Sequence, residues 1–383
     1  MRREVIMKVL FLGWEFPPHS VGGLGRHTYE VVKELSKIMD VSLILPFSDY
    51  QNIQKVKFKI APLNEMTSIY KNFKAGGFSE LYEDIQHEIE SYTKNVLRIV
   101  KTEKFDIIQA NDWITARAGI AVKKMTGKPL VITMHSTESD RTIGHPWPAI
   151  ERQEKSAVQS ADAIVAVSER LKGELIKNYG VKPEKISVIY NAIDRAEFNL
   201  PRTNERSKIV LYTGRLSPQK GIDHLIRAFK TVTKNDKDAL LYIVGEGPEL
   251  KNLIELSIDL GLSDKVIFLG RVSDEDIDYF YSIARVFVMP SVSEPFGITA
   301  LEAIASGTPA IVSIQSGVAE LLKNVFKVDF WDSDQMADMI LGLLTYKGIN
   351  ETMSAEAYKE LTNLTWKDTA NKFFNLYKKL TKS

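Results

Sequence analysis

Short apolar runs alternate with longer amphipathic stretches along most of the chain. The runs of the first half are rich in Val, Ile and Leu and lack strict alternation; they span residues 8–14, 41–46, 105–111, 129–135, 161–168 and 186–194. Such runs are typical of strands that are buried on both faces of a sheet. The stretches between them, such as 25–39 and 79–101, have helical spacing. This alternation predicts a parallel sheet covered by helices.

The pattern breaks once and then starts again. Residues 195–208 are polar and contain a proline, so we predict a linker there. A second series of apolar runs follows, each with a helical stretch behind it: 209–217, 239–247, 265–272, 285–292 and 309–313. We therefore predict an α/β protein with two Rossmann-like, doubly wound domains, 1–195 and 196–365, that face each other across a cleft. Residues 366–383 form a predicted last helix that could pack on either domain, including back onto the first.

Composition narrows the functional classes. The chain has 383 residues, which suits two domains of roughly 100–200 residues each. Its net charge is +1 without a basic block, so we expect no nucleic-acid partner. The absence of cysteine excludes disulfides, thiol nucleophiles and thiolate metal sites, and it agrees with a reducing, cytoplasmic location.

Membrane insertion and secretion are not expected. No apolar run reaches the ~20 residues that span a bilayer. The apolar run near the N-terminus is short, and Pro17 and Pro18 follow it where a signal peptide needs small residues for cleavage. We therefore interpret this run as the first buried strand.

Glycines follow the first predicted strand. Ligands of doubly wound sheets bind beyond the carboxyl ends of the strands. Gly22 and Gly23 lie there, directly before a helical pattern, where glycine lets backbone N–H groups approach an anion. An ordinary glycine turn into a helix explains them equally well, because a single Gly-rich turn is a weak signal.

Two cations follow the first predicted strand of the second domain. Arg215 and Lys220 flank a turn marked by Pro218 and Gly221. An arginine fork and a lysine point charge on one loop suit a diphosphate. A solvated basic loop is the alternative, but the expected position opposite the glycine turn favours the diphosphate.

Other polar residues at predicted strand ends have weaker signals. His135 ends one strand, Asp112 and Trp113 follow another, and Asn191 lies near the end of the first domain. A single strand-end histidine is more often structural than catalytic. Asp112 could also cap a helix, and Asn191 could form a turn.

Two glutamates stand eight positions apart near the end of the second series. Glu294 lies in a loop after a predicted strand, where it can point at a ligand. Glu302 lies about two turns into a helix with apolar neighbours, so its carboxylate needs a partner, and the diol of a ribose would serve. A solvated helix face is the simplest alternative. A glycosidase pair is disfavoured, because a hydrolase does not need a cationic loop for a diphosphate.

Metal binding is not expected. Asp-x-Asp triplets occur at 236–238, 276–278 and 332–334, in polar loops or first helical turns where acidic residues favour the helix dipole. The six histidines show no spacing typical of zinc.

Three motifs together resemble the retaining nucleotide-sugar glycosyltransferases of the GT-B fold, family four. "SEPFGITALEAIASGTPAI" looks like the family's Glu-x7-Glu signature, "GRLSPQKG" is similar to its diphosphate loop, and "WEFPPHSVGGLGRH" resembles the loop of glycogen and starch synthases. The resemblance covers nearly the whole chain. Two features depart from it: "IQSGVAE" lacks the family's Gly-Gly pair, and Glu302 stands where bacterial starch synthases carry tyrosine.

The resemblance implies roles for the matching residues. Gly22 and Gly23, Arg215 and Lys220 would hold the donor diphosphate, with Arg215 and Lys220 also catalytic. Glu294 and His135 would act at the donor sugar. Further donor-binding positions are Arg271 and Val272 at the base, Glu302 at the ribose, and Phe296, Gly297 and Ile298. Asp112, Trp113 and Asn191 would line the acceptor side of the cleft.

The resulting expectation is a retaining hexosyltransferase that needs no cofactor or metal beyond its nucleotide-sugar. The favoured reaction moves glucose from ADP- or UDP-glucose onto an α-1,4-glucan, as in a glycogen synthase. Transfer of mannose or another hexose to a lipid, glycan or small molecule is the main alternative. A nucleotide-sugar epimerase and a non-enzymatic sugar-binding protein remain as other classes. Base, sugar, acceptor and oligomeric state stay open.

Overall fold

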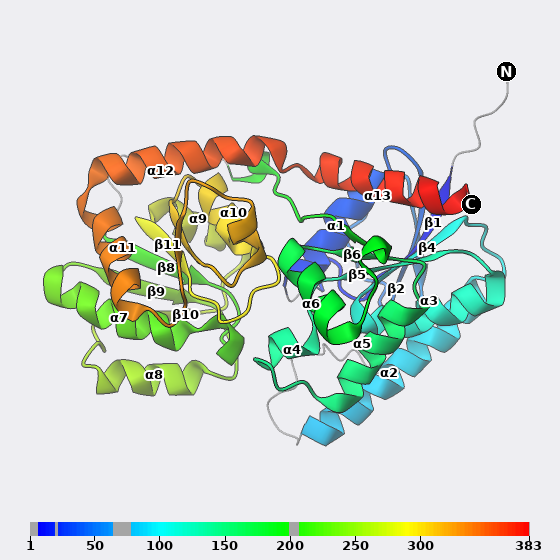
Figure 1. Cartoon of the computed structure of the whole chain (residues 1–383), viewed down its shortest axis with the longest axis horizontal. Helices are drawn as coiled ribbons and strands as arrows, with labels where there is room; N and C mark the ends of the chain where they lie inside the picture. The colour runs from blue at the N-terminus through cyan, green and yellow to red at the C-terminus, as the bar shows by residue number, and fades with distance from the viewer. Residues whose placement is uncertain (1–6, 20–21, 64–77, 199–206, 383) are drawn as a thin grey trace. The chain divides into compact units, whose positions relative to one another are not determined.

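The computed structural model describes residues 7–19, 22–63, 78–198 and 207–382. These residues group into two compact units (Figure 1). Unit 1 comprises Met1–Glu138, Trp147–Asn191 and Trp366–Ser383, and unit 2 comprises Ser139–Pro146 and Ala192–Thr365. The last helix of the chain therefore belongs to unit 1. Of the predicted linker, residues 199–206 lie outside the described residues.

The sheet of unit 1 is parallel throughout. Its strands are β1 (Lys8–Leu12), β2 (Asp40–Leu45), β3 (Val56–Ile60), β4 (Ile107–Asn111), β5 (Leu130–Met134), β6 (Ala163–Ala166) and β7 (Ile186–Val188). Their order is β3-β2-β1-β4-β5-β6-β7. The central β4 and β5 are buried along their whole length, which explains their unbroken apolar sequence. The sequence pattern missed β3, because this edge strand is only partly buried and alternates lysines with apolar residues.

Helices cover both faces of this sheet. They are α1 (Gly23–Leu35), α2 (Phe78–Ile99), α3 (Asp112–Thr126), α5 (Pro148–Ser160), α6 (Glu169–Tyr179) and α13 (Trp366–Thr381), with the short α4 (Glu138–Arg141) at a unit boundary. Figure 1 shows α1 and α13 packed together on one face and α2, α3 and α5 on the other. The buried side of α13 carries Trp366, Ala370, Phe373 and Tyr377, whose spacing of three and four residues makes one helical face.

Unit 2 repeats the arrangement with one strand fewer. Its strands are β8 (Ile209–Thr213), β9 (Leu240–Val244), β10 (Val266–Gly270), β11 (Val286–Met289), β12 (Ala310–Ser313) and β13 (Phe326–Val328). All pairs are parallel, in the order β10-β9-β8-β11-β12-β13. The sequence pattern did not predict β13, because three residues are too few to show a period.

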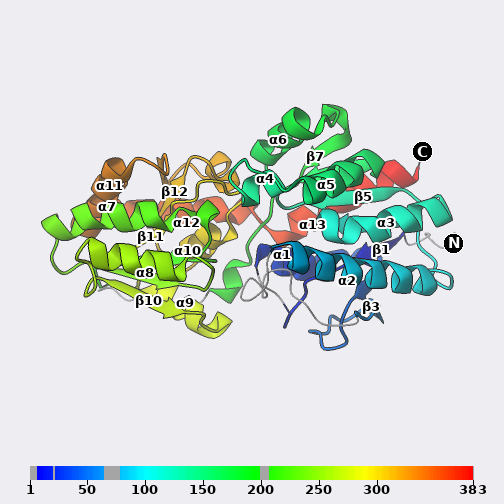
Figure 2. The ribbon, with the colours of Figure 1, turned by 90° about the horizontal axis from the view of Figure 1, so that it is seen from below.

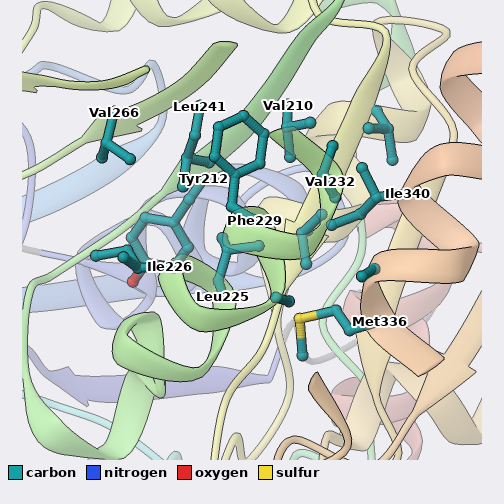
Figure 3. Packing of buried hydrophobic residues seen from close by; sticks show 14 of the residues in the cluster. Val210, Tyr212, Leu225, Ile226, Phe229, Val232, Leu241, Val266, Met336 and Ile340 are labelled. Atoms are coloured by element: carbon teal, nitrogen blue, oxygen red, sulfur yellow. The ribbon is translucent and has the colours of Figure 1, made fainter. Parts of the chain in front are cut away.

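The helices of unit 2 are α7 (Ile222–Asn235), α8 (Leu250–Asp259), α9 (Asp274–Ile283), α10 (Ile298–Ala305), α11 (Ser333–Thr345) and α12 (Lys347–Glu360). The 3-10 turns of the chain are η1 (Pro183–Lys185), η2 (Arg195–Glu197), η3 (Pro218–Lys220), η4 (Gly317–Glu320) and η5 (Leu361–Asn363). Helices α7 and α8 lie on the same face of the sheet (Figure 2), and α11 packs against α7. Figure 3 shows Phe229 of α7 and Met336 and Ile340 of α11 in one core with Val210 and Leu241 of the sheet.

Both sheets reverse their strand order at one place. In unit 1 the reversal lies between β1 and β4, and in unit 2 it lies between β8 and β11. The crevice at the carboxyl ends of two such strands is where doubly wound sheets bind ligands. The predicted fold class, two Rossmann-like α/β domains, is confirmed. The loops after β1, β4, β8 and β11 lie at the two reversals.

Candidate active site

The loops after β8 and β11 are joined by an ion pair. Lys220 ends the short η3 turn after β8, and Glu294 lies after β11. Lys220 Nζ is 2.6 Å from Glu294 Oε2, and Ser291 Oγ donates a hydrogen bond of 3.3 Å to the same oxygen. The two charged side chains are only 21% and 12% exposed. Two of the predicted site residues therefore meet at the switch point of unit 2, largely sheltered from water.

Two glycines allow these loops to approach each other. Gly221 has φ +61°, and a Cβ there would lie 2.3 Å from the carbonyl oxygen of Pro290, at the end of β11. Gly297 has φ +109°, and a Cβ there would lie 2.7 Å from Cε of Met289. Both positions have a left-handed conformation that favours glycine, and at Gly221 the backbone oxygen of Pro290 leaves no room for a Cβ. The tight turns hold Lys220 and the start of α10 close to β11.

The loop that carries Glu294 is fastened to the loop after β12. The Glu294 N–H donates to the Gln315 carbonyl at 3.1 Å, and the Gly317 N–H donates to the Glu294 carbonyl at 2.9 Å. The Val318 N–H donates to the Phe296 carbonyl at 2.7 Å, and Phe296 is buried. These bonds fix the N-terminus of α10, which begins at the buried Ile298 and whose first N–H groups have no acceptor within the helix.

Arg215 lies in the same turn as Lys220. It is half-buried, and its carbonyl accepts a hydrogen bond of 3.0 Å from the hydroxyl of Tyr212. Burial raises the pKa of Tyr212 well above 10, and the nearby negative charge of Glu294 raises it further. Tyr212 therefore stays protonated and anchors the backbone of the cationic turn.

Glu302 has the partner that its apolar surroundings require. Tyr281 of α9 donates a hydrogen bond of 3.0 Å to Glu302 Oε2. The Tyr281 oxygen lies 2.7 Å from Thr213 Oγ1, at the end of β8. Glu302 is thus tied to the same switch point as Lys220 and Glu294. Nothing in the sequence pattern pointed to Tyr281, because a tyrosine on a helix is usually a core residue.

Arg271 and Val272 lie farther along the sheet. They follow β10, the edge strand that is separated from β8 by β9. Arg271 is exposed and Val272 is half-buried. Within the described residues, neither of them forms a hydrogen bond or ion pair with Lys220 or Glu294.

In unit 1, Asp112 joins the ends of β4 and β5. Its Oδ1 accepts a hydrogen bond of 2.6 Å from the backbone N–H of His135. Asp112 is the first residue of α3 with φ +52°, and Asn111 is the N-cap. The expectation that Asp112 caps the helix is therefore wrong. Its carboxylate instead orients the strand-end loop of His135, and its left-handed backbone is strained for a residue with a side chain.

A buried pair of histidines lies beside this link. His27 of α1 donates from Nδ1 to Asn191 Oδ1 at 2.8 Å, and its ring contacts the ring of His135 edge-on, with centroids 4.4 Å apart. Burial lowers the pKa of His135 to about 3, and burial with the nearby His135 lowers that of His27. Both rings are therefore neutral at pH 7. Nε2 of each is enclosed and has no hydrogen-bond partner among the described residues.

His27 is not among the residues predicted for the site. A signal was present, since His27 follows the glycine turn and falls on the buried side of α1 with Val31 and Leu35. A polar ring on the apolar face of a helix needs a partner. Which partner it finds depends on the distant Asn191.

The remaining predicted residues of unit 1 have plainer surroundings. Gly22 and Gly23 are exposed at the start of α1, and a Cβ on Gly22 would meet no atom within 4 Å. Close packing therefore does not require glycine at position 22. Trp113 is buried inside α3 of unit 1, as a core residue would be.

The acidic triplets have structural partners. Asp332 caps α11 by accepting from the Gln335 N–H, and Asp236 pairs with Lys208 at 2.9 Å. The part of the chain that the structure describes contains no group of three histidine or acidic side chains placed to hold a metal. The described helices are each too short or too polar to cross a bilayer.

Comparisons with known proteins agree with this arrangement. Residues 21–197 match the model of glycosyltransferase family 4, and residues 194–360 match that of glycosyl transferases group 1. An uncharacterized glycosyltransferase of Methanocaldococcus jannaschii is 31% identical over 97% of this chain and 98% of its own. A glycogen synthase of Mycobacterium tuberculosis is 28% identical over 83% and 80% of the two chains. A D-inositol 3-phosphate glycosyltransferase of Salinispora arenicola is 28% identical over 79% and 75%.

Solved structures have the same fold. Sucrose-phosphate synthase from Thermosynechococcus elongatus superposes with a TM-score of 0.78 at 21% identity, over 98% of this chain and 99% of its own. Anabaena HepE, solved with UDP and glucose, gives a TM-score of 0.73 at 19% identity, over 97% and 100%. The family models and the shared fold thus define a glycosyltransferase of the GT-B fold. Within that class, the chain belongs to glycosyltransferase family 4.

Proposed function

We propose that this glycosyltransferase is a retaining hexosyltransferase that moves glucose from ADP- or UDP-glucose onto an α-1,4-glucan. The observation that carries the proposal is the sheltered Lys220–Glu294 pair at the switch point of unit 2. A cation and a carboxylate side by side match the two ends of a nucleotide-sugar, the anionic diphosphate and the hydroxyl-rich sugar.

The paired groups suggest how a donor is received. A diphosphate that enters beside Arg215 and Lys220 offers Lys220 a doubly charged partner in place of Glu294. Glu294, held by the backbone bonds to Gln315 and Gly317, then accepts hydrogen bonds from the sugar. After the exchange Lys220 faces an anion and Glu294 accepts hydrogen bonds from the sugar hydroxyls, so neither buried charge is left without a partner.

The reaction replaces one bond at C1 of the sugar with another. The bond from C1 to the diphosphate oxygen breaks, and a bond from C1 to the acceptor hydroxyl oxygen forms on the same face. The acceptor proton passes to the departing phosphate oxygen. The leaving group gains negative charge, which Arg215, Lys220 and the N-terminal N–H groups of α10 stabilise as preorganised electrostatics. The proposal needs no metal for this step.

The neutral histidines suit the sugar side of the reaction. His135 carries no charge at pH 7, so it can donate or accept a hydrogen bond without attracting a second anion. Asp112 and Asn191 hold this region in place and would line the acceptor side. The first N–H groups of α1, which begins at Gly23, would suit an anionic group of a ligand.

Glucose and glucan are favoured by likeness to relatives. The relative from M. tuberculosis is named a glycogen synthase, and the Anabaena structure holds UDP and glucose. The likeness to a D-inositol 3-phosphate glycosyltransferase supports a second candidate, transfer of mannose or another hexose to a small molecule, lipid or glycan. A cytoplasmic location belongs to the proposal because the chain has no cysteine.

The test is release of nucleoside diphosphate from ADP-glucose, UDP-glucose and GDP-mannose, with and without a malto-oligosaccharide, in EDTA. We expect release from a glucose donor that the oligosaccharide stimulates, and a product with an α-linkage by NMR. Release from GDP-mannose alone would contradict the sugar and the acceptor. Interconversion of the sugar without an acceptor would identify an epimerase, and binding without turnover would identify a sugar-binding protein.

A further inference from the structure

Tyr281 occupies a position that the transfer chemistry does not explain. It lies on α9, is fully buried, and places its hydroxyl between Glu302 on α10 and Thr213 at the end of β8. Its ring packs edge-on against Phe287 of β11, with centroids 5.9 Å apart, and its carbonyl accepts a hydrogen bond from Thr308. Both the ring and the backbone are therefore held, and the hydroxyl has a fixed place.

The direction of the hydrogen bonds follows from chemistry. An ionised carboxylate can only accept, so the Tyr281 O–H donates to Glu302 Oε2 at 3.0 Å. The Tyr281 oxygen then accepts from the hydroxyl of Thr213 at 2.7 Å. The result is a one-way chain from Thr213 through Tyr281 to Glu302, in which every donor has a defined acceptor.

This chain restricts Glu302. A glutamate side chain on a helix turns freely about three bonds unless something holds it. One oxygen of Glu302 is held by a rigid phenol, which sets the plane of the carboxylate. A carboxylate has about four acceptor positions, so it can still accept from a ligand hydroxyl.

We propose that Tyr281 is a positioning residue that orients Glu302 toward the ribose of the nucleotide and thereby makes the site select ribonucleotides over 2′-deoxyribonucleotides. The proposal rests on the proposed function, with Glu302 at the ribose as the resemblance implies. Thr213 supports Tyr281 from the far side. Burial, followed by the charge of Glu302, raises the pKa of Tyr281 well above 10, so the phenol remains a donor at every pH used for an assay.

The experiment compares dissociation constants for UDP with 2′-deoxy-UDP, and for ADP with 2′-deoxy-ADP, by titration calorimetry. We expect wild type to prefer the ribonucleotide of its cognate pair about tenfold or more, as for one hydrogen bond to a charged group. Tyr281→Phe should lower this preference to about two- to threefold, with a smaller drop for Thr213→Val. Tyr242→Phe is the matched control, because Tyr242 of β9 packs edge-on against Phe280 and is not part of the chain from Thr213 to Glu302.

The preference ratio separates positioning from general damage. A merely destabilised site would weaken both nucleotides equally and leave the ratio at its wild-type value. An unchanged ratio in Tyr281→Phe, with a ratio lost in Glu302→Gln, would overturn the role of Tyr281 and leave the proposed function intact. An unchanged ratio in Glu302→Gln would overturn the ribose assignment itself.

Discussion

The two units share a fold but differ in the side chains on the loops that follow their strands. In unit 2 the loops after β8 and β11 carry the Lys220–Glu294 pair and Arg215. In unit 1 the loops after β4 and β5 lead to His135, which contacts His27, and burial keeps both rings neutral. Both sheets are parallel, and the strand order reverses once in each. The difference teaches that the side chains on the loops, and not the sheet, decide which chemical groups each unit can bind.

Burial has opposite consequences in the two places. The ion pair of unit 2 tolerates low exposure because each charge faces its opposite. For the histidines of unit 1, burial is the largest influence on the pKa, so both rings give up their protons instead. A charged ligand group therefore suits unit 2, and a neutral, hydroxyl-rich one suits unit 1.

The largest effect should come from removing a cation in unit 2. Lys220→Ala and Arg215→Ala should each lower kcat/KM by about 10²–10³-fold, because the departing diphosphate loses a preorganised charge. Steady-state kinetics with the best donor measure this. Lys251→Ala, on an 85% exposed side chain of α8, should change nothing. Wild-type turnover in either site variant would show that the cations of unit 2 do not contribute to catalysis.

The next effect concerns the carboxylate of the pair. Glu294→Gln keeps the shape but not the charge, so the rate should fall about 10²-fold while the dissociation constant for UDP or ADP changes little. Single-turnover kinetics and calorimetry together separate the two quantities. If the rate and the nucleotide affinity fall by the same factor, Glu294 contributes to nucleotide binding and has no separate role in the transfer step.

The neutral histidines of unit 1 predict a pH dependence of stability. Burial lowers the folded-state pKa of both histidines below the ordinary 6.5, to about 3 for His135. Below pH 6.5 the unfolded chain therefore binds more protons than the folded chain. The free energy of unfolding should therefore fall as pH is lowered below about 6.5, by up to about 1.4 kcal/mol per pH unit for each histidine. Urea denaturation from pH 8 to 4.5 measures the slope.

The control for this slope uses another histidine. His135→Gln should flatten it, whereas His145→Gln, at an exposed position, should leave it as in wild type. An equal slope in wild type and His135→Gln would mean that His135 is not held neutral by the fold.

The smallest effect tests how α13 supports unit 1. The hydroxyl of Tyr377 donates to Gln109 Oε1 at 2.9 Å, and Gln109 donates to Thr133 Oγ1, one residue before the end of β5. Tyr377→Phe leaves the buried Gln109 oxygen unpaired and should cost about 1–2 kcal/mol of unfolding free energy. Urea denaturation at pH 8 checks this. As a control, Tyr346→Phe should leave the free energy of unfolding unchanged, because Tyr346 is 61% exposed. If Tyr377→Phe also leaves it unchanged, α13 is held on the sheet by packing alone.

Most of the fold could be predicted from the order of residues. Central strands such as β4 and β8 are buried on both faces, so their apolar runs are unbroken and visible. The edge strand β3 and the three-residue β13 could not, because partial burial and short length erase the pattern. The strand-end positions of Lys220, Glu294 and His135 followed from the same periodicity, since parallel strands place their carboxyl ends together.

The order of residues was enough to predict the features that follow local rules: buried strands, amphipathic helices, glycine turns and charged residues at strand ends. Contacts between distant segments depended on the folded chain. The sequence alone could not show that Tyr281 reaches Glu302, that His27 reaches Asn191 across 164 positions, or that Asp112 serves a neighbouring strand instead of its own helix. Periodicity reports which face of an element is buried, whereas a partner is chosen by how two buried faces pack, and that choice has no local trace in the sequence.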